Sequence, residues 1–308
     1  MTRFKDLLFV ITMPVGLAAC AIPAPSQCTA PVAVQILGSG GPVAEGHRAG
    51  TSAIVWIGGK AALLVDAGSG AFVRYGESGA KFADHRAILF THFHADHVAD
   101  LDAILNSGGF ANRAAPLPIA GPSGDELYPG IKDHLTALFD EHTGAFRYLS
   151  GYLDGNFGLP MLEPTEIDVA IETLQPIIQE RDLKVSAITV HHGGVPALAY
   201  LVETGEKSVI FAGDQSFLSE KFVQVFQDFK PDILIMHNVI PEGDGQPRGL
   251  HRWPGSIGEV AAAIKPKNLV LAHNMKRALS HQAEGETAIR NYYSGPLQVA
   301  DDLDCFAL

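Results

Sequence analysis

The sequence is poor in cysteine and in basic residues, and each shortage excludes a class of protein. Three cysteines among 308 residues are too few for a small fold held together by disulfides. The 22 Lys and Arg are outnumbered by 34 Asp and Glu, for a net charge of −12. Such a chain repels nucleic-acid backbones at long range, so we expect no nucleic-acid partner. Beyond the N-terminus no apolar run reaches the ~18 residues of a membrane span. Hydrophobic residues form 47% of the chain, enough for a large buried core.

The first residues are typical of an export signal. Arg3 and Lys5 precede an apolar run at 7–17 and the small residues Ala18 and Ala19, which predicts a signal peptide at 1–19 rather than a buried N-terminal helix. The Leu-Ala-Ala-Cys sequence at 17–20 resembles a bacterial lipobox, in which the cysteine is acylated; plain cleavage nearby is the alternative. We therefore expect an exported, periplasmic lipoprotein whose only membrane contact is a lipid on Cys20, with a lipidated tether at 20–31 and a folded domain at 32–308.

Export also bears on the two remaining cysteines. Cys28 lies just before the first expected strand, and Cys305 lies close to the C-terminus. In an oxidising compartment these two side chains could form a disulfide that ties the two ends of the domain together. Two unpaired thiols are the alternative, and we favour the disulfide.

Apolar patterning along the chain alternates between strand and helix. It predicts strands at 32–37, 52–57, 62–65, 86–91, 117–120, 166–175, 183–190, 198–203, 207–211, 233–236 and 269–272. It predicts helices at 98–105, 124–142 with a break near Pro129, 217–229, 257–264 with a capping box from Ser256 to Glu259, and 282–293. Residues 143–165 and 243–249 are expected loops. Two mixed sheets between two helical layers suit this order, although periodicity alone does not separate them from one doubly wound sheet.

Thirteen histidines is a high count, and their placement is the main signal. His92, His94, Asp96 and His97 follow the apolar segment at 86–91. In extended chain His92 and His94 project to the same side, and Asp96 and His97 follow where a helix begins. Crowded imidazoles repel each other when protonated, whereas a metal ion binds them as neutral ligands. The motif therefore predicts a metal site in preference to a hydrogen-bonded polar turn.

Further polar residues follow later apolar strands. His191 and His192 follow the segment at 187–190, Asp214 follows 209–211, and His273 follows 269–272. A histidine at a strand end is by itself more often a structural group. Strand ends are nevertheless where ligands bind in open α/β sheets, and taken with the first motif these residues are expected to complete the metal site.

These motifs resemble those of the metallo-β-lactamase superfamily, in particular its ribonuclease Z/arylsulfatase-like branch, from about residue 34 to the end. The supporting stretches are Gly-rich 37–42, Leu-Val-Asp-Ala-Gly at 64–68, the 91–97 motif, 120–124, His-Gly-Gly-Val-Pro at 192–196, Phe-Ala-Gly-Asp at 211–214 and Ala-His at 272–273. The resemblance implies an α/β fold, an αββα sandwich of two mixed β-sheets flanked by helices, with two divalent metal ions, Zn²⁺ being the expected metal.

The resemblance also implies roles for individual residues. It assigns His92, His94 and His192 to the first metal, Asp96, His97 and His273 to the second, and Asp214 to both. His191 is the rival of His192, which we prefer because Gly193 and Gly194 follow it. Asp66 would buttress the metal-binding turn.

Two segments depart from ribonuclease Z itself. His237 lies in Met-His-Asn-Val at 236–239, where that branch has His-Glu-Ala-Thr, and His251 lies in His-Arg-Trp at 251–253, where it has His-Ser-Thr. No Gly/Lys-rich insertion resembles the tRNA-gripping arm. With export and the acidic charge, these departures argue against tRNA processing and favour a small-molecule ester substrate.

We therefore expect an exported binuclear hydrolase of sulfate or phosphate (di)esters, arylsulfatase- or phosphodiesterase-like, in which a hydroxide between the metals attacks the ester. Asp96 would take up the proton of the nucleophile, and His251 would be the general acid, with His237 as competitor. Charge for an anionic ester is expected from Arg248, Arg252, Lys276 and Arg277. The alternatives are a lactonase or β-lactamase and, in another class, a non-catalytic metal-binding lipoprotein. The remaining histidines are expected to be surface or structural: His47, His85, His134, His142 and His281.

Overall fold

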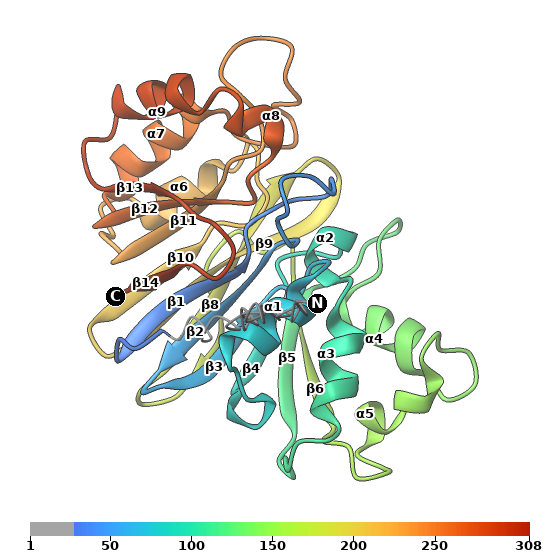
Figure 1. Ribbon diagram of the computed structural model, residues 1–308. Helices are drawn as coiled ribbons and strands as arrows, with labels where there is room; N and C mark the ends of the chain where they lie inside the picture. Colours follow the sequence, from blue (N-terminus) through green and yellow to red (C-terminus); the bar gives the residue numbers. More distant parts are fainter. Residues whose placement is uncertain (1–27) are drawn as a thin grey trace, which may run out of the picture.

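The computed structural model describes residues 28–308 (Figure 1). The signal peptide at 1–19 and most of the tether at 20–31 lie outside these residues. Among the described helices, none is long and apolar enough to cross a membrane.

The first sheet is built mainly from the N-terminal half of the chain. Its seven strands, in spatial order, are β14 (Cys305–Ala307), β1 (Val32–Gly38), β2 (Ser52–Ile57), β3 (Lys60–Val65), β4 (Ala87–Leu89), β5 (Leu117–Pro122) and β6 (Leu162–Ile167). β14 to β3 pair antiparallel and β3 to β6 parallel. The β2–β3 hairpin turns through Gly58 and Gly59, whose φ angles of 59° and 73° suit glycine.

The second sheet comes from the C-terminal half. Its seven strands, in spatial order, are β13 (Leu297–Val299), β12 (Asn268–Ala272), β11 (Ile233–His237), β10 (Lys207–Phe211), β9 (Val195–Thr204), β8 (Lys184–His192) and β7 (Gln175–Gln179). β10 to β13 are parallel, so their carboxyl ends lie at the same edge of the sheet.

Three apolar layers hold the molecule together. Alternate residues of both sheets, such as Val34, Val185 and Tyr200, are buried between the sheets. The outer face of the first sheet packs against α1 (Ala71–Ser78), α3 (Leu101–Gly108), α4 (Ile131–Phe139) and α5 (Gly151–Asp154). The outer face of the second sheet packs against α6 (Glu220–Phe226), α7 (Pro254–Ile264) and α9 (Gln282–Arg290). Figure 1 shows the two helical layers on opposite sides of the paired sheets. The expected αββα sandwich is confirmed.

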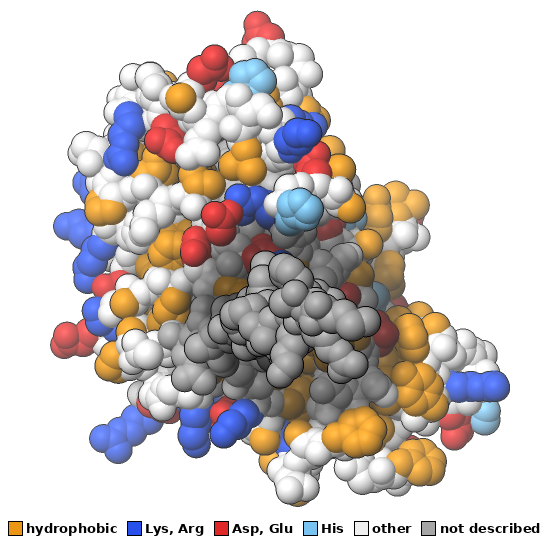
Figure 2. Space-filling view, in the orientation of Figure 1, with side chains coloured by type: hydrophobic (Ala, Val, Ile, Leu, Met, Phe, Trp, Pro, Cys, Tyr) orange, Lys and Arg blue, Asp and Glu red, His pale blue; other side chains and the backbone are white. Residues whose placement is uncertain are grey.

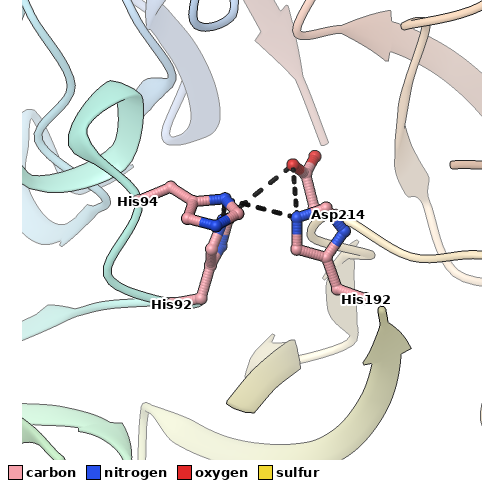
Figure 3. A group of neighbouring side chains, drawn as sticks. All are labelled: His92, His94, His192 and Asp214. Carbon is pink, nitrogen blue, oxygen red and sulfur yellow. Dashed lines mark hydrogen bonds and ion pairs between the residues drawn. The ribbon is translucent and has the colours of Figure 1, made fainter. Parts of the chain in front are cut away.

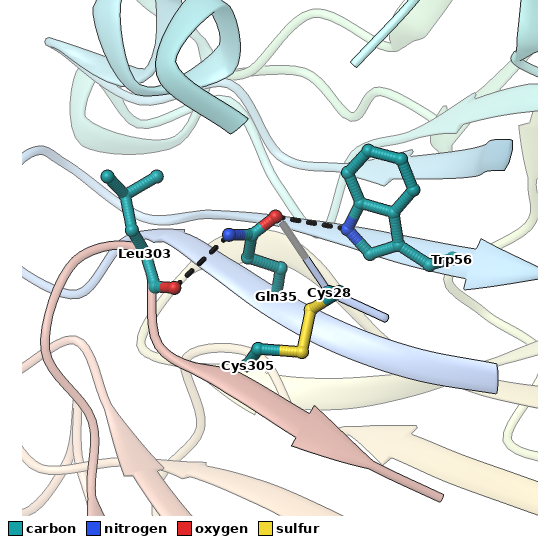
Figure 4. Close-up of a disulfide and its surroundings, with 5 residues drawn as sticks. All are labelled: Cys28, Gln35, Trp56, Leu303 and Cys305. Carbon is teal, nitrogen blue, oxygen red and sulfur yellow. Dashed lines mark hydrogen bonds between the residues drawn. A yellow bond between two sulfur atoms is a disulfide. The ribbon is translucent and has the colours of Figure 1, made fainter. Parts of the chain in front are cut away.

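Four short helices complete the fold. They are η1 (Phe82–Asp84), α2 (Ala95–Val98), η2 (Arg147–Leu149) and α8 (Lys276–Leu279). The expected disulfide between Cys28 and Cys305 is present and joins the start of the domain to β14 (Figure 4).

Aspartate side chains explain two errors in the expected elements. The predicted strand at 166–175 is wrong: β6 ends at Ile167, and the Asp168 carboxylate accepts the N–H of Ala170 at 2.9 Å, which turns the chain before β7. The predicted helix at 124–142 begins only at Ile131, since Asp125 accepts the N–H groups of Leu127 and Tyr128 in a turn.

Two further expectations fail for equally local reasons. The capping box at Ser256 is wrong because α7 already begins at Pro254, which suits the first helical position. Ser256 instead accepts a hydrogen bond from Arg252 at 3.0 Å. The expected loop at 143–165 contains η2, α5 and the start of β6.

Candidate metal centre

The predicted metal ligands come together where strands of both sheets end. The 91–97 turn follows β4, His192 ends β8, Asp214 follows β10, and His273 follows β12. Because β10 and β12 both pair parallel to β11, Asp214 and His273 lie at one edge. The donor atoms fall into groups, and in each group all of them lie within 4.8 Å of one another. The first group is His92, His94, His192 and Asp214, and the second group is Asp96, His97 and His273.

The first group is dominated by imidazoles. His92 Nε2 lies 2.9 Å from His94 Nδ1, and His192 Nε2 lies 3.3 Å from the same atom. Asp214 Oδ2 closes the group at 3.4 Å from His192 Nε2 (Figure 3). Burial lowers the pKa of His92 well below its ordinary value and also lowers that of His94. Both rings are therefore neutral at pH 7, the form that binds metal.

The second group has more carboxylate character. Asp96 Oδ2 lies 3.0 Å from His273 Nε2 and 3.6 Å from His97 Nε2. Asp214 reaches this group as well, with Oδ1 at 3.5 Å from His273 Nε2 and Oδ2 at 3.8 Å from His97 Nε2. Burial raises the pKa of Asp214, but the neighbouring histidines outweigh burial and hold that pKa well below its ordinary value. Asp214 is thus an ionised carboxylate that faces both groups.

A buried aspartate on the first sheet supports His97 from behind. Asp66 Oδ2 lies 2.8 Å from His97 Nδ1, and Asp66 Oδ1 accepts the N–H of Thr91 at 2.7 Å. Burial alone would lower the pKa of His97, but Asp66, Asp214 and Asp96 raise it to about 9. The site therefore has a strong negative potential that attracts cations. The bond between Asp66 and His97 Nδ1 also orients the ring so that Nε2 faces the cluster. Carboxylates commonly orient metal-binding histidines in this way.

The donor set fits divalent metal ions. Among the described residues, the buried Nε2 atom of His97 has no hydrogen-bond partner, although it faces Asp96 and Asp214. A bound cation would satisfy this nitrogen. Two glycines allow the necessary close packing. A Cβ on Gly68 would lie 2.0 Å from the carbonyl oxygen of Asp96, and a Cβ on Gly41 would lie 2.3 Å from His273 Cε1.

His237 is closer to the centre than the sequence indicated. Its Nδ1 lies 2.6 Å from Asp214 Oδ1, and it forms a third potential metal-binding group with Asp214 and His273. It does not line the cleft above the centre. His237 ends β11, between the strands that present Asp214 and His273, so its position in the chain was the available signal.

An open cleft of about 680 Å³ leads to the centre and is lined by His94, Asp96, His192, Asp214 and His273. His251 lies on its wall, with Nδ1 3.9 Å from Asp214 Oδ1. Pro42, Val43, Pro247 and Leu250 give the walls an apolar character.

The cations expected to face a substrate are arranged differently from the prediction. Among those four, only Arg277 lines the cleft. Arg252 is buried and bonds Gln215, Ser256 and the Ser219 carbonyl, and Arg248 lies over the Trp253 ring, 4.2 Å from its centroid. Lys276 lies beside the cleft in an adjoining pocket. Arg48, which was not among the expected cations, also lines the cleft.

Strand alternation places the side chain of His192 in the cluster and that of His191 on the other side of β8. His191 Nδ1 bonds Ser216 Oγ at 2.8 Å, away from the cluster. His192 lies in the cluster, and its Nδ1 is 3.0 Å from the Leu250 carbonyl oxygen. His85 is buried with its Nε2 2.8 Å from the Tyr75 hydroxyl, a structural role. His47 and His142 are exposed.

The family model described as the metallo-beta-lactamase superfamily matches residues 46–273. The chain belongs to this superfamily and is one of its hydrolases, with a His/Asp cluster suited to divalent metal ions.

Its relatives include proteins named ribonuclease Z. The one from Mycolicibacterium paratuberculosis is 33% identical over 287 residues, which is 88% of this chain and 96% of that protein. The one from Mycobacterium bovis is 32% identical over 185 residues, 59% of this chain and 62% of that protein. The solved structure of human tRNase Z, short form, has the same fold, with a TM-score of 0.68 at 18% identity over 89% of this chain and 98% of that one.

These relatives contradict the expectation of no nucleic-acid partner, because they are by name ribonucleases. The error came from net charge. On the face shown in Figure 2, acidic and basic side chains are interspersed, so the net charge of the chain does not describe the potential in the cleft, whose lining includes Asp96 and Asp214 as well as Arg48 and Arg277. Bound cations would change that local potential further.

Proposed function

We propose that this protein is a binuclear metal-dependent phosphodiesterase whose substrates include RNA. The observation that carries the proposal is the position of Asp214. Its carboxylate lies 3.4 Å from His192 Nε2 of the first group and 3.5 Å from His273 Nε2 of the second, and Asp214 lines an open cleft. This arrangement suits an ester that is bound and cleaved over two cations. The ribonuclease Z relatives, which by name cleave RNA, support the choice of phosphodiesters.

The residues that would hold the ions follow from the two groups. His92, His94 and His192 would hold one ion, Asp96, His97 and His273 the other, and Asp214 both. A donor set of imidazole and carboxylate suits Zn²⁺. When bound, the pair would acidify water and neutralise charge on the phosphoryl oxygens.

The chain itself supplies proton transfer and orientation. Burial raises the pKa of Asp96, but His273, whose Nε2 lies 3.0 Å from Asp96 Oδ2, and the charge of His97 outweigh burial and lower it. Asp96 lines the cleft and is therefore a carboxylate that can accept a proton from attacking water. Arg277 donates through Nε to the Val239 carbonyl at 2.8 Å, and its terminal nitrogens, which bond no other residue in the described part of the chain, would bind a phosphoryl oxygen.

His251 is better placed than His237 to assist the leaving group. His251 lines the cleft, whereas His237 bonds Asp214 and lies outside the lining. Burial and the neighbouring histidines lower the pKa of His251 to about 3, so its ring is neutral at pH 7. A neutral imidazole still carries one N–H, which can donate a hydrogen bond to the departing oxygen.

Metal removal tests the mechanism and a substrate panel tests the specificity. Chelated protein is expected to lose turnover and to recover it when Zn²⁺ is added back. The panel compares an aryl phosphodiester, a single-stranded oligoribonucleotide, an aryl sulfate, a lactone and a cephalosporin. We expect the two phosphodiesters to be cleaved fastest. Full activity without metal contradicts the mechanism. Faster turnover of the sulfate or of the carbonyl substrates contradicts the substrate class, and no turnover of any of them indicates a non-catalytic metal-binding protein.

We also propose that the protein is exported to the periplasm and anchored by a lipid on Cys20. The Cys28–Cys305 disulfide supports export, because disulfides persist in oxidising compartments. Fractionation of expressing bacterial cells is expected to place the protein in the membrane fraction, and Cys20→Ala is expected to prevent lipid labelling. Wild-type protein found unlabelled in the cytoplasm would contradict this.

A further inference from the structure

One wall of the cleft is a loop that packs against the metal centre. This cleft loop, residues 39–49, connects β1 to β2 and places Gly41, Pro42, Val43 and Arg48 along the cleft. Gly41 packs so closely on the His273 ring that no Cβ would fit between them. The position of the cleft loop therefore affects both the shape of the cleft and the surroundings of His273.

A single carboxylate from the C-terminal segment holds both ends of the cleft loop. Asp302 Oδ1 accepts from the Ser39 N–H at 2.9 Å and from the Ser39 hydroxyl at 2.7 Å. Asp302 Oδ2 accepts from the Ala49 N–H at 2.9 Å and from Arg74 Nε at 3.0 Å. Four donors thus converge on a side chain that is only 10% exposed. Hydrogen bonds to a charged acceptor are among the stronger ones in proteins.

The residues just before Asp302 extend this network to the metal centre. Arg48, on the cleft wall, donates through Nη1 to Ser39 Oγ at 2.6 Å and to the Ala300 carbonyl at 2.8 Å. Asn274, the neighbour of His273 in the chain, donates through its N–H to the Ser39 carbonyl at 2.6 Å and through Nδ2 to the Ala300 carbonyl at 2.9 Å. Residues 300–302 therefore bond both the cleft loop and the turn that presents His273.

The C-terminal segment is itself held by the disulfide. It crosses from β13 in the second sheet to β14 in the first, and β14 is a three-residue edge strand. Short edge strands are held by few backbone bonds. Additional bonds come from Gln35, whose Nε2 donates to the Leu303 carbonyl at 3.1 Å while its Oε1 accepts from Trp56 Nε1 at 3.1 Å (Figure 4). The covalent link from Cys305 to Cys28 prevents this segment from detaching.

We propose that Asp302 is a positioning residue that sets the cleft loop against the metal centre, and that the Cys28–Cys305 disulfide secures it there. The inference deepens the proposed phosphodiesterase function and rests on it for its effect on turnover. Asp302 does not line the cleft, so it acts on a substrate through the loop. Loss of its carboxylate is expected to weaken substrate binding while the metal ligands stay in place.

Amide hydrogen exchange of Asp302→Asn tests the contact directly and does not depend on catalysis. Asn keeps the size of the side chain but replaces one acceptor oxygen with a donor. We expect amides of the cleft loop to exchange at least tenfold faster than in wild-type protein. The matched control is Asp133→Asn, which removes an exposed carboxylate on α4 and is expected to leave the exchange of the loop unchanged. Loop exchange in Asp302→Asn equal to that of wild-type protein would overturn the proposal.

Kinetics of the zinc-loaded protein then separate positioning from a general loss of structure. For Asp302→Asn we expect KM for the oligoribonucleotide to rise at least fivefold, with kcat within twofold of wild type and an unchanged metal content. An unchanged KM would overturn the positioning role. Wild-type protein without any turnover would refute the proposed function. The exchange measurement would still show whether Asp302 holds the cleft loop in place. If Asp302→Asn does not fold, Ser39→Ala removes the hydroxyl bonds alone and is expected to produce smaller changes in the same directions.

Reduction of wild-type protein tests the disulfide. A dithiol donates two electrons and two protons, so Cys28 and Cys305 become thiols and the reagent becomes a cyclic disulfide. We expect faster exchange in β14 and in the cleft loop and a higher KM, both reversed on reoxidation. A Cys28→Ser, Cys305→Ser double variant should behave like reduced protein and should no longer respond to the dithiol. Identical exchange and KM in the oxidised and reduced forms would overturn the role of the disulfide.

Discussion

The two halves of the chain build the metal centre in different ways. The first half supplies its donors from a single turn after β4, with His92, His94, Asp96 and His97 almost consecutive. The second half supplies its donors one at a time, with His192, Asp214 and His273 at the ends of different strands.

The difference lies in what holds the donors in place. The local set depends on one backbone turn and on Asp66, which bonds both Thr91 and His97. The distributed set depends on strand register: His237 pairs with Ala272, and Phe211 pairs with Ile235. A single side chain, Asp214, lies within 4 Å of donor atoms in both groups. Removing Asp214 should therefore damage the whole centre, whereas changes confined to one half should cost less.

Asp214→Asn is expected to have the largest effect on turnover. The amide keeps the shape but removes the negative charge between the two donor groups. We expect kcat/KM to fall on the order of 10³-fold, because charge stabilisation by both ions is lost together. Metal analysis should find fewer than two ions per chain. A variant that retains both ions and loses less than tenfold in kcat/KM would show that the halves do not meet at Asp214.

Asp66→Asn should have a smaller effect that begins in the local half. Its bond to His97 would weaken, which removes part of the negative potential that raises the pKa of His97. Loss of such a supporting contact typically costs about 10–100-fold in metal affinity. Competition with a chromogenic chelator measures this. Activity at saturating Zn²⁺ should largely recover, unlike that of Asp214→Asn, and a failure to recover would mean that Asp66 does more than orient His97.

The same contrast explains how much of the site the sequence could predict. The local motif is readable because His92 and His94 must share a side of an extended chain. His192, Asp214 and His273 could be proposed as donors only when taken together, because each follows an apolar strand. Their assignment to particular metal ions came from the family resemblance. The sandwich followed from alternating patterns together with that resemblance.

The misread elements depend on contacts that patterning does not contain. Arg252 and Arg277 look alike in sequence, yet Arg252 is buried against Gln215 and Ser256 whereas Arg277 lines the cleft. Asp168 ends a strand through a hydrogen bond two residues onward. The network around Asp302 joins positions about 260 residues apart in the chain, a distance over which local spacing carries no information.

His251 and His237, both from the second half, should differ in a way that leaving groups reveal. His251→Ala is expected to slow a poorly leaving alkyl phosphodiester about 10–100-fold and a nitrophenyl diester only a few-fold, because only the poor leaving group needs a hydrogen-bond donor. His237→Ala should slow both equally and weaken metal binding, since His237 bonds Asp214. Equal slowing of both substrates by His251→Ala would show that His251 does not assist the leaving group.

The smallest effect on turnover is expected at His85, a buried histidine of the first half outside the centre. Burial lowers its pKa from 6.5 to about 4. Between these values the unfolded chain binds more protons than the folded one, so His85 makes stability fall as the pH drops from 6.5 to 4, by about 3 kcal/mol in total. His85→Gln should reduce this dependence in denaturant titrations at several pH values, while kcat at pH 7 stays within twofold of wild type.

The matched control is His142→Gln, which replaces an exposed histidine and should keep the pH dependence of wild-type stability. If the free energy of unfolding of His85→Gln depends on pH as strongly as that of wild-type protein, the acid sensitivity comes from the metal-centre histidines instead. Metal-loaded and metal-free samples would then differ in that pH dependence.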